Sequence, residues 1–352
     1  MKKVLIIFFF LIFSSNLPAQ ILLDPYDIYY GRQPSARAEA MGRGMAANPS
    51  NEFASFYNPA SSSFTHGINF TFSHSTKYYN DKNANFNYEG VSYDLKKGRG
   101  NIGLSRYYMG AGNELNGDNF NYTFYTINYS RHVIHGFYAG ANLNIINSHI
   151  PGYESHRGYI LPENVTAASV DIGAIKTFNL TGKSFRGLLH EITLGASVTN
   201  VSFTVLQSFF GRQNLPVLLR VGGAYNVRFY NFMPTDNEKG VPGFTYKLNL
   251  LVHLEMEKEL RYDNHDIYKA GAEATIYEIL SLRGGFYSNW YSGGYKYNYF
   301  TYGAGINIPI NKLTHGDYPF GISIDYANMK QPATRDYGRF NILSMKLNWI
   351  PD

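Results

Sequence analysis

The segment EITLGASVT at residues 191–199 decides the fold that the sequence predicts. Apolar side chains alternate in it with polar or small ones, the apolar set being Ile192, Leu194, Ala196 and Val198. Because the side chains of a β-strand point alternately to its two faces, this strand has one apolar and one polar face. The same alternation runs through residues 246–256 and 320–326. Strands of this kind are typical of a transmembrane β-barrel, with one face toward lipid and the other toward a polar lumen.

About fourteen such segments follow one another, separated by clusters of Gly, Asn, Asp, Lys and Pro. We expect strands over 67–75, 86–95, 99–109, 119–131, 134–148, 165–178, 188–200, 215–229, 244–257, 266–276, 279–288, 295–308, 318–327 and 338–349. The sequence therefore predicts an all-β fold, an antiparallel barrel of about 14 strands. Two connections, 179–187 and 230–243, are longer than a periplasmic turn should be and leave the count open by one strand pair. A soluble two-sheet sandwich is the alternative, but it does not explain so many strands that are apolar on one face only.

The composition favours the same class of protein. The chain has 31 Tyr and 25 Phe, yet its mean hydropathy is −0.27. Outer-membrane barrels combine aromatic girdles at the two membrane interfaces with a polar lumen, which explains both values. After the first 20 residues no apolar run approaches the length of a membrane-spanning helix, and this excludes an α-helical membrane protein.

The first 19 residues have the pattern of a secretory signal peptide: Lys2 and Lys3, an apolar run over 4–13, and a small residue, Ala19, at the expected cleavage site. We therefore expect export to the outer membrane of a Gram-negative bacterium. The chain has no cysteine, which excludes a lipoprotein anchor, disulfides and thiol chemistry. Removal of the two lysines leaves 29 basic against 26 acidic residues, a net charge of +3. No run of five basic residues occurs, so nucleic acid is not an expected partner.

The stretch between the leader and the first strand, residues 20–65, does not read as strand and turn. Its centre is rich in Ala and Gly, so its backbone is thin enough to lie in a crowded channel. We predict that it forms a hatch inside the lumen, with residues 66–352 as the barrel. Asn51 is a candidate N-cap for a short helix through Tyr57, which must end by Asn58 because Pro59 disfavours the helical conformation before it.

Two motifs in this stretch resemble the N-terminal signature of the FadL-like outer-membrane proteins, which include the PorV and PorQ group of the phylum Bacteroidetes. The motif residues are Ala36, Arg37, Ala38, Ala40, Met41 and Gly42, followed by Asn58, Pro59 and Ala60. The resemblance implies a 14-stranded barrel with an N-terminal hatch. The chain departs from the family pattern in two places: Arg43 separates two glycines that are often adjacent, and Ser61 stands where a glycine commonly follows the tripeptide.

The resemblance implies two kinds of function, and we favour the first. FadL-type members bind hydrophobic small molecules and pass them through the barrel when the hatch shifts. PorV-type members serve the type IX secretion system and dock exported proteins, here through the loops 149–164 and 202–214. Contacts with an apolar ligand or a partner are expected from the aromatic residues Phe53, Phe56, Tyr57, Phe203, Phe209 and Phe210. Outer-membrane lipid is a partner in either case.

Charged residues on the predicted lumen face are the remaining candidates. They include Arg220, Glu255, Glu273, Arg283 and Asp325, with Asp171, Lys176, Arg228, Lys247 and Lys269 on the same alternation. They could hold the hatch, or they could merely neutralise one another. We predict that Arg37 and Arg43 pair with Glu273 and Asp325.

Metal and catalytic chemistry find little support in the sequence. His253 and Glu255 share a strand face, but a metal needs at least a third ligand that the sequence does not supply. No Gly-x-Ser-x-Gly elbow, phosphate loop or nucleophilic cysteine occurs. We therefore expect no metal, no cofactor and no enzymatic activity.

Overall fold

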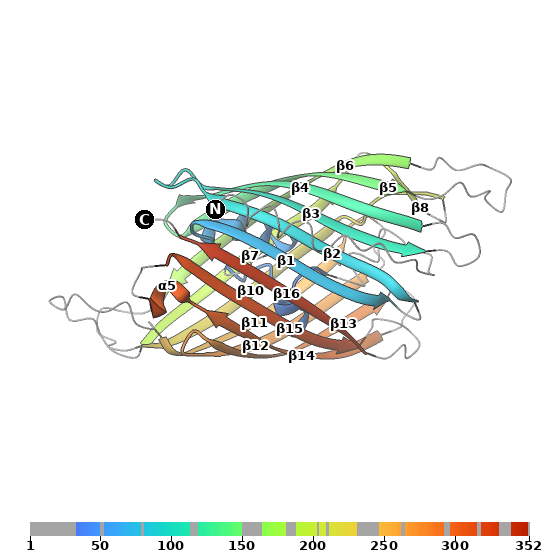
Figure 1. Cartoon of the computed structure of the whole chain (residues 1–352). Helices are drawn as coiled ribbons and strands as arrows, with labels where there is room; N and C mark the ends of the chain where they lie inside the picture. Colours follow the sequence, from blue (N-terminus) through green and yellow to red (C-terminus); the bar gives the residue numbers. More distant parts are fainter. Residues whose placement is uncertain are drawn as a thin grey trace, which may run out of the picture.

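The computed structural model shows a closed antiparallel β-barrel of fourteen strands (Figure 1). It describes residues 33–49, 53–78, 81–112, 119–149, 164–180, 188–202, 204–208, 211–230, 246–261, 265–291, 296–314, 318–330 and 339–350. The wall consists of β1 (Ile68–Tyr78), β2 (Asp81–Asp94), β3 (Asn101–Gly112), β4 (Asn119–Ile134), β5 (Phe137–His149), β6 (Asn164–Asn179), β7 (Leu188–Val201), β10 (Leu218–Tyr230), β11 (Tyr246–Glu259), β12 (His265–Ile276), β13 (Leu280–Tyr291), β14 (Lys296–Ile308), β15 (Phe320–Lys330) and β16 (Arg339–Trp349).

Each wall strand pairs with its neighbours in sequence order, and the barrel closes where β1 pairs with β16, with Ile68 opposite Trp349. The predicted fold class and strand number are therefore confirmed, and every predicted segment overlaps one of these strands. The long connections at 181–187 and 231–245 lie outside the described residues, and the barrel closes without a strand from either.

The predicted alternation is present on the wall. Leu194 and Leu254 are 50% and 71% exposed on the outer face, whereas Thr193 and His253 beside them are buried in the lumen. The outer face is thus a largely apolar surface, as contact with lipid requires. No helix in the part of the chain that the structure describes is long and apolar enough to cross a membrane.

The two ends of the barrel differ. We call the end that holds Ile68 and Trp349 the proximal end and the opposite one the distal end. Tight turns join strands at the proximal end: His135 and Gly136, with φ of 33° and 72°, form a two-residue hairpin turn of the kind that suits the strand twist. Two features were not predicted: α5 (Ile310–Leu313) at the proximal end, and a distal hairpin of β8 (Leu206–Ser208) and β9 (Gly211–Gln213).

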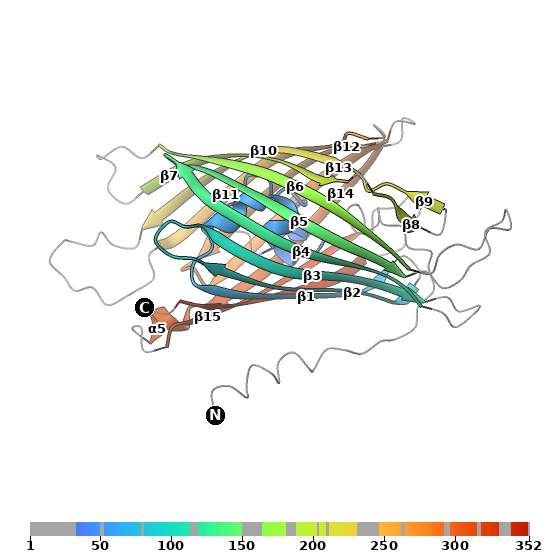
Figure 2. The same ribbon diagram turned by 90° about the horizontal axis from the view of Figure 1, so that it is seen from above.

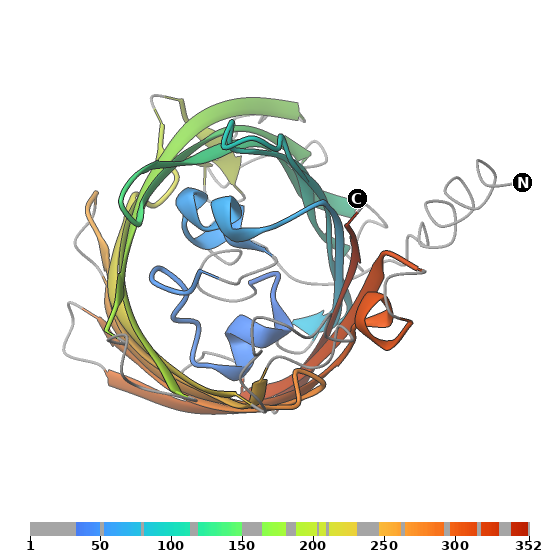
Figure 3. The ribbon, with the colours of Figure 1, turned by 90° about the vertical axis from the view of Figure 1, so that its left-hand side faces the viewer.

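The segment that precedes β1 lies inside the barrel (Figures 2 and 3). We use the name hatch for its described residues, 33–49 and 53–66. The hatch contains α3 (Ala36–Ala40), α4 (Ala54–Tyr57) and the 3₁₀ helix η1 (Pro59–Phe64). The sequence gave no expectation of α3, although Ser35 caps it by accepting a hydrogen bond from the backbone N–H of Ala38.

The second helix of the hatch ends where it was expected to end. Asn58 has an extended backbone, with φ of −147° and ψ of 111°, as the following Pro59 favours. The candidate N-cap Asn51 and the signal peptide at 1–19 lie outside the described residues.

Candidate functional site

The hatch docks directly against the backbone of the wall at a series of glycines. A methyl group at Gly195 would lie 1.9 Å from the carbonyl oxygen of Ala46, and one at Gly285 would lie 2.1 Å from the backbone nitrogen of Gly42. Gly140, Gly173, Gly271 and Gly303 also face hatch atoms at distances that a Cβ could not keep. The hatch therefore fits the wall so closely that side chains on these strands would displace it.

An ion-pair network joins the hatch to β12, β13 and β15. Glu273 accepts two hydrogen bonds from Arg37, at 2.8 Å from Nε and 2.7 Å from Nη2. It also accepts one from Arg283 at 2.5 Å, and Arg283 in turn donates to Asp325 at 2.6 Å. All four side chains are at least nine-tenths buried, so little solvent screens their charges. The predicted pairing of Arg37 with Glu273 is confirmed.

The predicted pairing of Arg43 with a barrel acid is wrong. Its Nε donates to Glu39 of the hatch itself at 2.7 Å, because residues four apart at the end of a helix lie on the same side. Arg43 has φ of 68°, the left-handed region that favours glycine, and its guanidinium lies 4.9 Å from the ring centre of Tyr287. Burial lowers its pKa, but the Glu39 carboxylate raises it more, so the net pKa is above the ordinary value and Arg43 stays charged.

A second network lies on β10, β11 and β12. Glu257 accepts hydrogen bonds from Arg220 at 2.5 Å and from Lys269 at 2.9 Å, and Lys269 also donates to Glu255 at 2.9 Å. The hatch joins it because the backbone N–H of Ala46 donates to Glu255 at 2.6 Å. Glu257 was missed by the sequence reasoning, although continuing the alternation two residues beyond Glu255 would have found it.

The five principal lumen charges all face the lumen, but one of the further charges does not. Lys176 lies on the outer face, because Ile175 beside it is buried inside the barrel and neighbouring residues of a strand face opposite sides. Its predicted lumen position is therefore wrong. Arg228 and Lys247 lie near the proximal rim, where Arg228 is 3.8 Å from Glu191.

Asn58 of the tripeptide motif ties the hatch to two wall strands. Its side-chain oxygen accepts from the backbone N–H of Ala60 and so caps η1. Its Nδ2 lies 2.7 Å from the carbonyl oxygen of Ala46 and 3.2 and 3.3 Å from those of Ala174 and Ala196. Pro59 follows at the first helical position, which tolerates the missing N–H. The motif thus fixes the end of the hatch against β6 and β7.

The distal half of the lumen is lined by apolar and aromatic side chains, which we call the apolar cup. On β2 to β5 they are Phe86, Tyr88, Tyr107, Met109, Tyr122, Phe124 and Ile146, and on β12 to β16 they are Ile267, Tyr287, Tyr299, Met329 and Phe340. Phe53 and Phe56 of the hatch close its floor, with ring centres 4.9 Å from Tyr88 and 5.9 Å from Tyr107. A barrel lumen is ordinarily polar, so this lining is unusual.

The other predicted aromatic contacts have different outcomes. Tyr57 is fully buried beside Phe56, and burial raises the pKa of its phenol well above the ordinary value, so it is neutral. Phe203, Phe209 and Phe210 lie outside the described residues.

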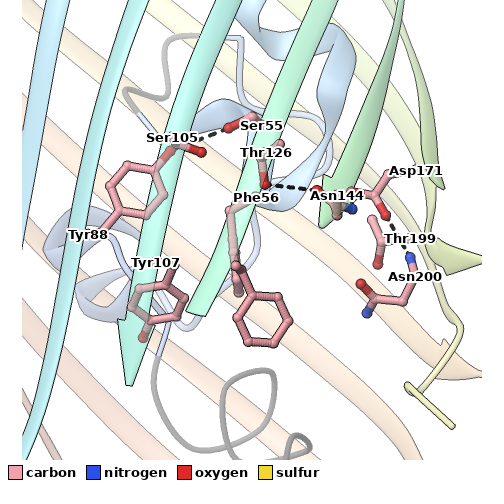
Figure 4. Close-up of a pocket in the computed structure, with 11 residues that line it drawn as sticks. Ser55, Phe56, Tyr88, Ser105, Tyr107, Thr126, Asn144, Asp171, Thr199 and Asn200 are labelled. Atoms are coloured by element: carbon pink, nitrogen blue, oxygen red, sulfur yellow. Dashed lines mark hydrogen bonds between the residues drawn. The ribbon is translucent and has the colours of Figure 1, made fainter. Parts of the chain in front are cut away.

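A cavity lies where the apolar cup meets the hatch (Figure 4). Phe56, Tyr107 and Phe124 line one side, and Asp171 and Asn200 lie on the other. Asp171 accepts from Asn200 at 2.6 Å and from two further asparagine side chains, so its carboxylate is well solvated by the protein. The space open to a water-sized molecule is about 30 Å³, which is too small for an organic ligand in this arrangement.

The described residues contain no group of three or more His, Asp or Glu side chains that could hold a metal ion. His253 is buried against the hatch, where a methyl group at Gly44 would lie 2.7 Å from its Nε2. The pair His253 and Glu255 therefore belongs to the contact between wall and hatch.

Comparison with known proteins gives a fold likeness. No family model matches the chain, and no curated protein matches it. Among solved structures, the Pseudomonas putida toluene transporter TodX is 11% identical over 92% of this chain and 100% of its own, with a TM-score of 0.50. A mutant of the TodX monoaromatic hydrocarbon channel is 12% identical over 90% and 98%, also at 0.50. A Pseudomonas aeruginosa FadL homologue is 10% identical over 91% and 99%, at 0.47. The chain thus shares the barrel fold of the TodX channels over nearly its whole length.

Proposed function

We propose that the chain is a non-enzymatic, FadL-like channel of the outer membrane that binds a hydrophobic small molecule in the apolar cup and passes it inward beyond the hatch. The apolar cup is the observation that carries the proposal. Lumen-facing Phe, Tyr, Met and Ile remove no apolar surface from water unless something apolar covers them. A ligand that does so gains about 25 cal/mol per Å² of apolar surface buried.

The location follows from the outer wall and the leader. Alternate side chains of most strands present an apolar surface to the outside, and the first 19 residues have the pattern of an export signal. The solved barrels with the same fold include proteins described as toluene transporters, which supports transport as the class of function.

Passage requires the hatch to move in this proposal. The hatch occupies the lumen below the apolar cup, and the cavity between them is smaller than an organic ligand. The contacts that resist movement are the ion pair of Arg37 with Glu273, the Glu255 contact and the Asn58 bonds. Ligand binding would have to supply free energy comparable to the cost of breaking at least some of them.

Binding of an apolar fluorescent probe, N-phenyl-1-naphthylamine, to the purified protein tests the proposal with a matched pair of variants. Phe124 faces the apolar cup, and Tyr125 beside it faces outward and is 44% exposed. We expect Phe124→Ser to weaken binding about tenfold or more and Tyr125→Ser to leave it unchanged. Equal binding by both variants and the unchanged protein would refute a ligand site in the cup.

Docking of exported proteins, as in PorV-type members, is the competing role, and it is supported only by the resemblance of the hatch motifs. Extraction in mild detergent followed by mass spectrometry separates the two. A co-purifying lipid or other apolar molecule supports the channel, whereas a stoichiometric soluble protein in its place would favour docking.

A further inference from the structure

The outer face of β1, β2 and β3 is not apolar where the rest of the wall is. On β11 the outward side chains across the membrane region are all apolar: Leu248, Leu250, Val252, Leu254 and Met256. On β2 only Val91 and Tyr93 are apolar, and on β3 only Ile102 and Leu104 come before a charged residue. A strand crosses the membrane with about 9–11 residues and so needs about five outward apolar side chains. These strands fall short of that.

Polar side chains occupy the positions that lipid would otherwise meet. They form one continuous patch, which we call the polar wall: His74, Thr76, Asn85, Asn87, Glu89 and Arg106. Cross-strand pairing places Glu89 opposite Arg106, Asn87 opposite His74 and Asn85 opposite Thr76. They face outward because Phe86, Tyr88 and Tyr107 between them are buried in the apolar cup.

The charged pair of the polar wall lies near mid-height. Glu89 is five residues from the proximal end of β2, which corresponds to about 13 Å of height at about 3.3 Å per residue and a tilt of about 40°. This is close to the centre of an apolar band about 25 Å tall. Lipid headgroups at either rim do not reach that depth, so protein is the environment that suits these side chains.

We propose that the polar wall is the interface between two copies of this chain, side by side in the membrane. The patch is self-complementary, as a two-fold interface requires. Glu89 and Arg106 are adjacent on neighbouring strands, 3.2 Å apart, and their side chains are 33% and 39% exposed. A two-fold axis along the membrane normal places Arg106 of one copy opposite Glu89 of the other, and the amides of Asn85 and Asn87 can donate and accept across the axis.

Cysteine cross-linking in intact outer membranes tests the proposal, because the chain has no cysteine of its own. Asn87→Cys with a short bismaleimide should give a product of twice the chain mass. Leu194→Cys, on the outer face of β7 and 50% exposed, is the matched control and should give none. A product joining Asn87→Cys to a different protein, or no product at all, would overturn the proposal.

Charge reversal provides a second measurement. Glu89→Lys places like charges across the interface, and we expect it to lower the cross-linked fraction at least tenfold. Adding Arg106→Glu restores opposite charges and should restore the dimer. Heat-modifiable mobility on gels confirms that each variant forms a barrel. An undiminished dimer in folded Glu89→Lys would count against this pairing across the axis.

Discussion

Removing the carboxylate of Glu273 should release the hatch while leaving the barrel folded. Glu273 accepts hydrogen bonds from Arg37 of the hatch and from Arg283 of the wall, and all three side chains are almost fully buried. Glu273→Ala leaves the Arg37 guanidinium buried without its carboxylate, whereas Arg283 keeps Asp325. Removing one partner of a buried ion pair costs about 3–5 kcal/mol. Since about 1.4 kcal/mol is a factor of ten, the opening equilibrium of the hatch should increase on the order of 10²- to 10³-fold.

Thiol labelling measures this equilibrium directly. Met45 is fully buried in the hatch, so Met45→Cys introduces a single thiol that a maleimide reaches only when the hatch opens. The labelling rate should rise by the factor above in Glu273→Ala. It should fall back in the double variant Arg37→Met, Glu273→Ala, which removes the unpaired charge as well. A rate increase of less than fivefold would refute the reasoning, since the ion pair would then contribute little to holding the hatch.

Three further variants test other contacts of the hatch, each by hydrogen exchange of its amides. Gly285→Ala should loosen the hatch because the new methyl group meets backbone atoms, whereas Gly284→Ala next to it has no atom within 4 Å and should change nothing; equal protection in both would contradict the close docking. Asn58→Ala should cost about 1–3 kcal/mol by removing a cap and leaving a buried carbonyl unpaired, and unchanged protection of residues 58–64 would argue against that role. Arg43→Met should destabilise α3 by leaving Glu39 buried without its cation, and Glu39→Gln in the same chain should recover most of the loss; no recovery would show that the ion pair is not the cause.

Local patterns in the sequence were enough for the wall and for the end of the second helix. A strand that faces lipid on one side reveals itself by alternation over two residues, as in residues 191–199, and each strand does so independently of its neighbours. Pro59 limits the helix before it by a steric contact within two residues. The strand number followed from repeating the first argument along the chain.

Errors arose where local evidence was applied inconsistently or was overlooked. Asp171 and Lys176 are five residues apart on a strand, so alternation alone places them on opposite faces. Glu39 and Arg43 are four residues apart, a spacing that favours pairing on a helix, but α3 was not expected because its Ala-rich stretch was read as a thin extended chain.

The contacts that define the site depend on register and closure, which the sequence does not encode locally. Arg37 meets Glu273 across 236 positions of the chain, and Gly195 and Gly285 face the hatch only because the barrel is closed around it. The polar wall likewise becomes visible when β1, β2 and β3 are aligned side by side and their outward residues form one surface. By itself the sequence determined that the chain is a barrel with a non-strand segment before it. Only the tertiary structure decided which charges hold that segment and which part of the outer wall is polar, because strand alternation has a period of two residues and these neighbours are brought together from distant parts of the chain.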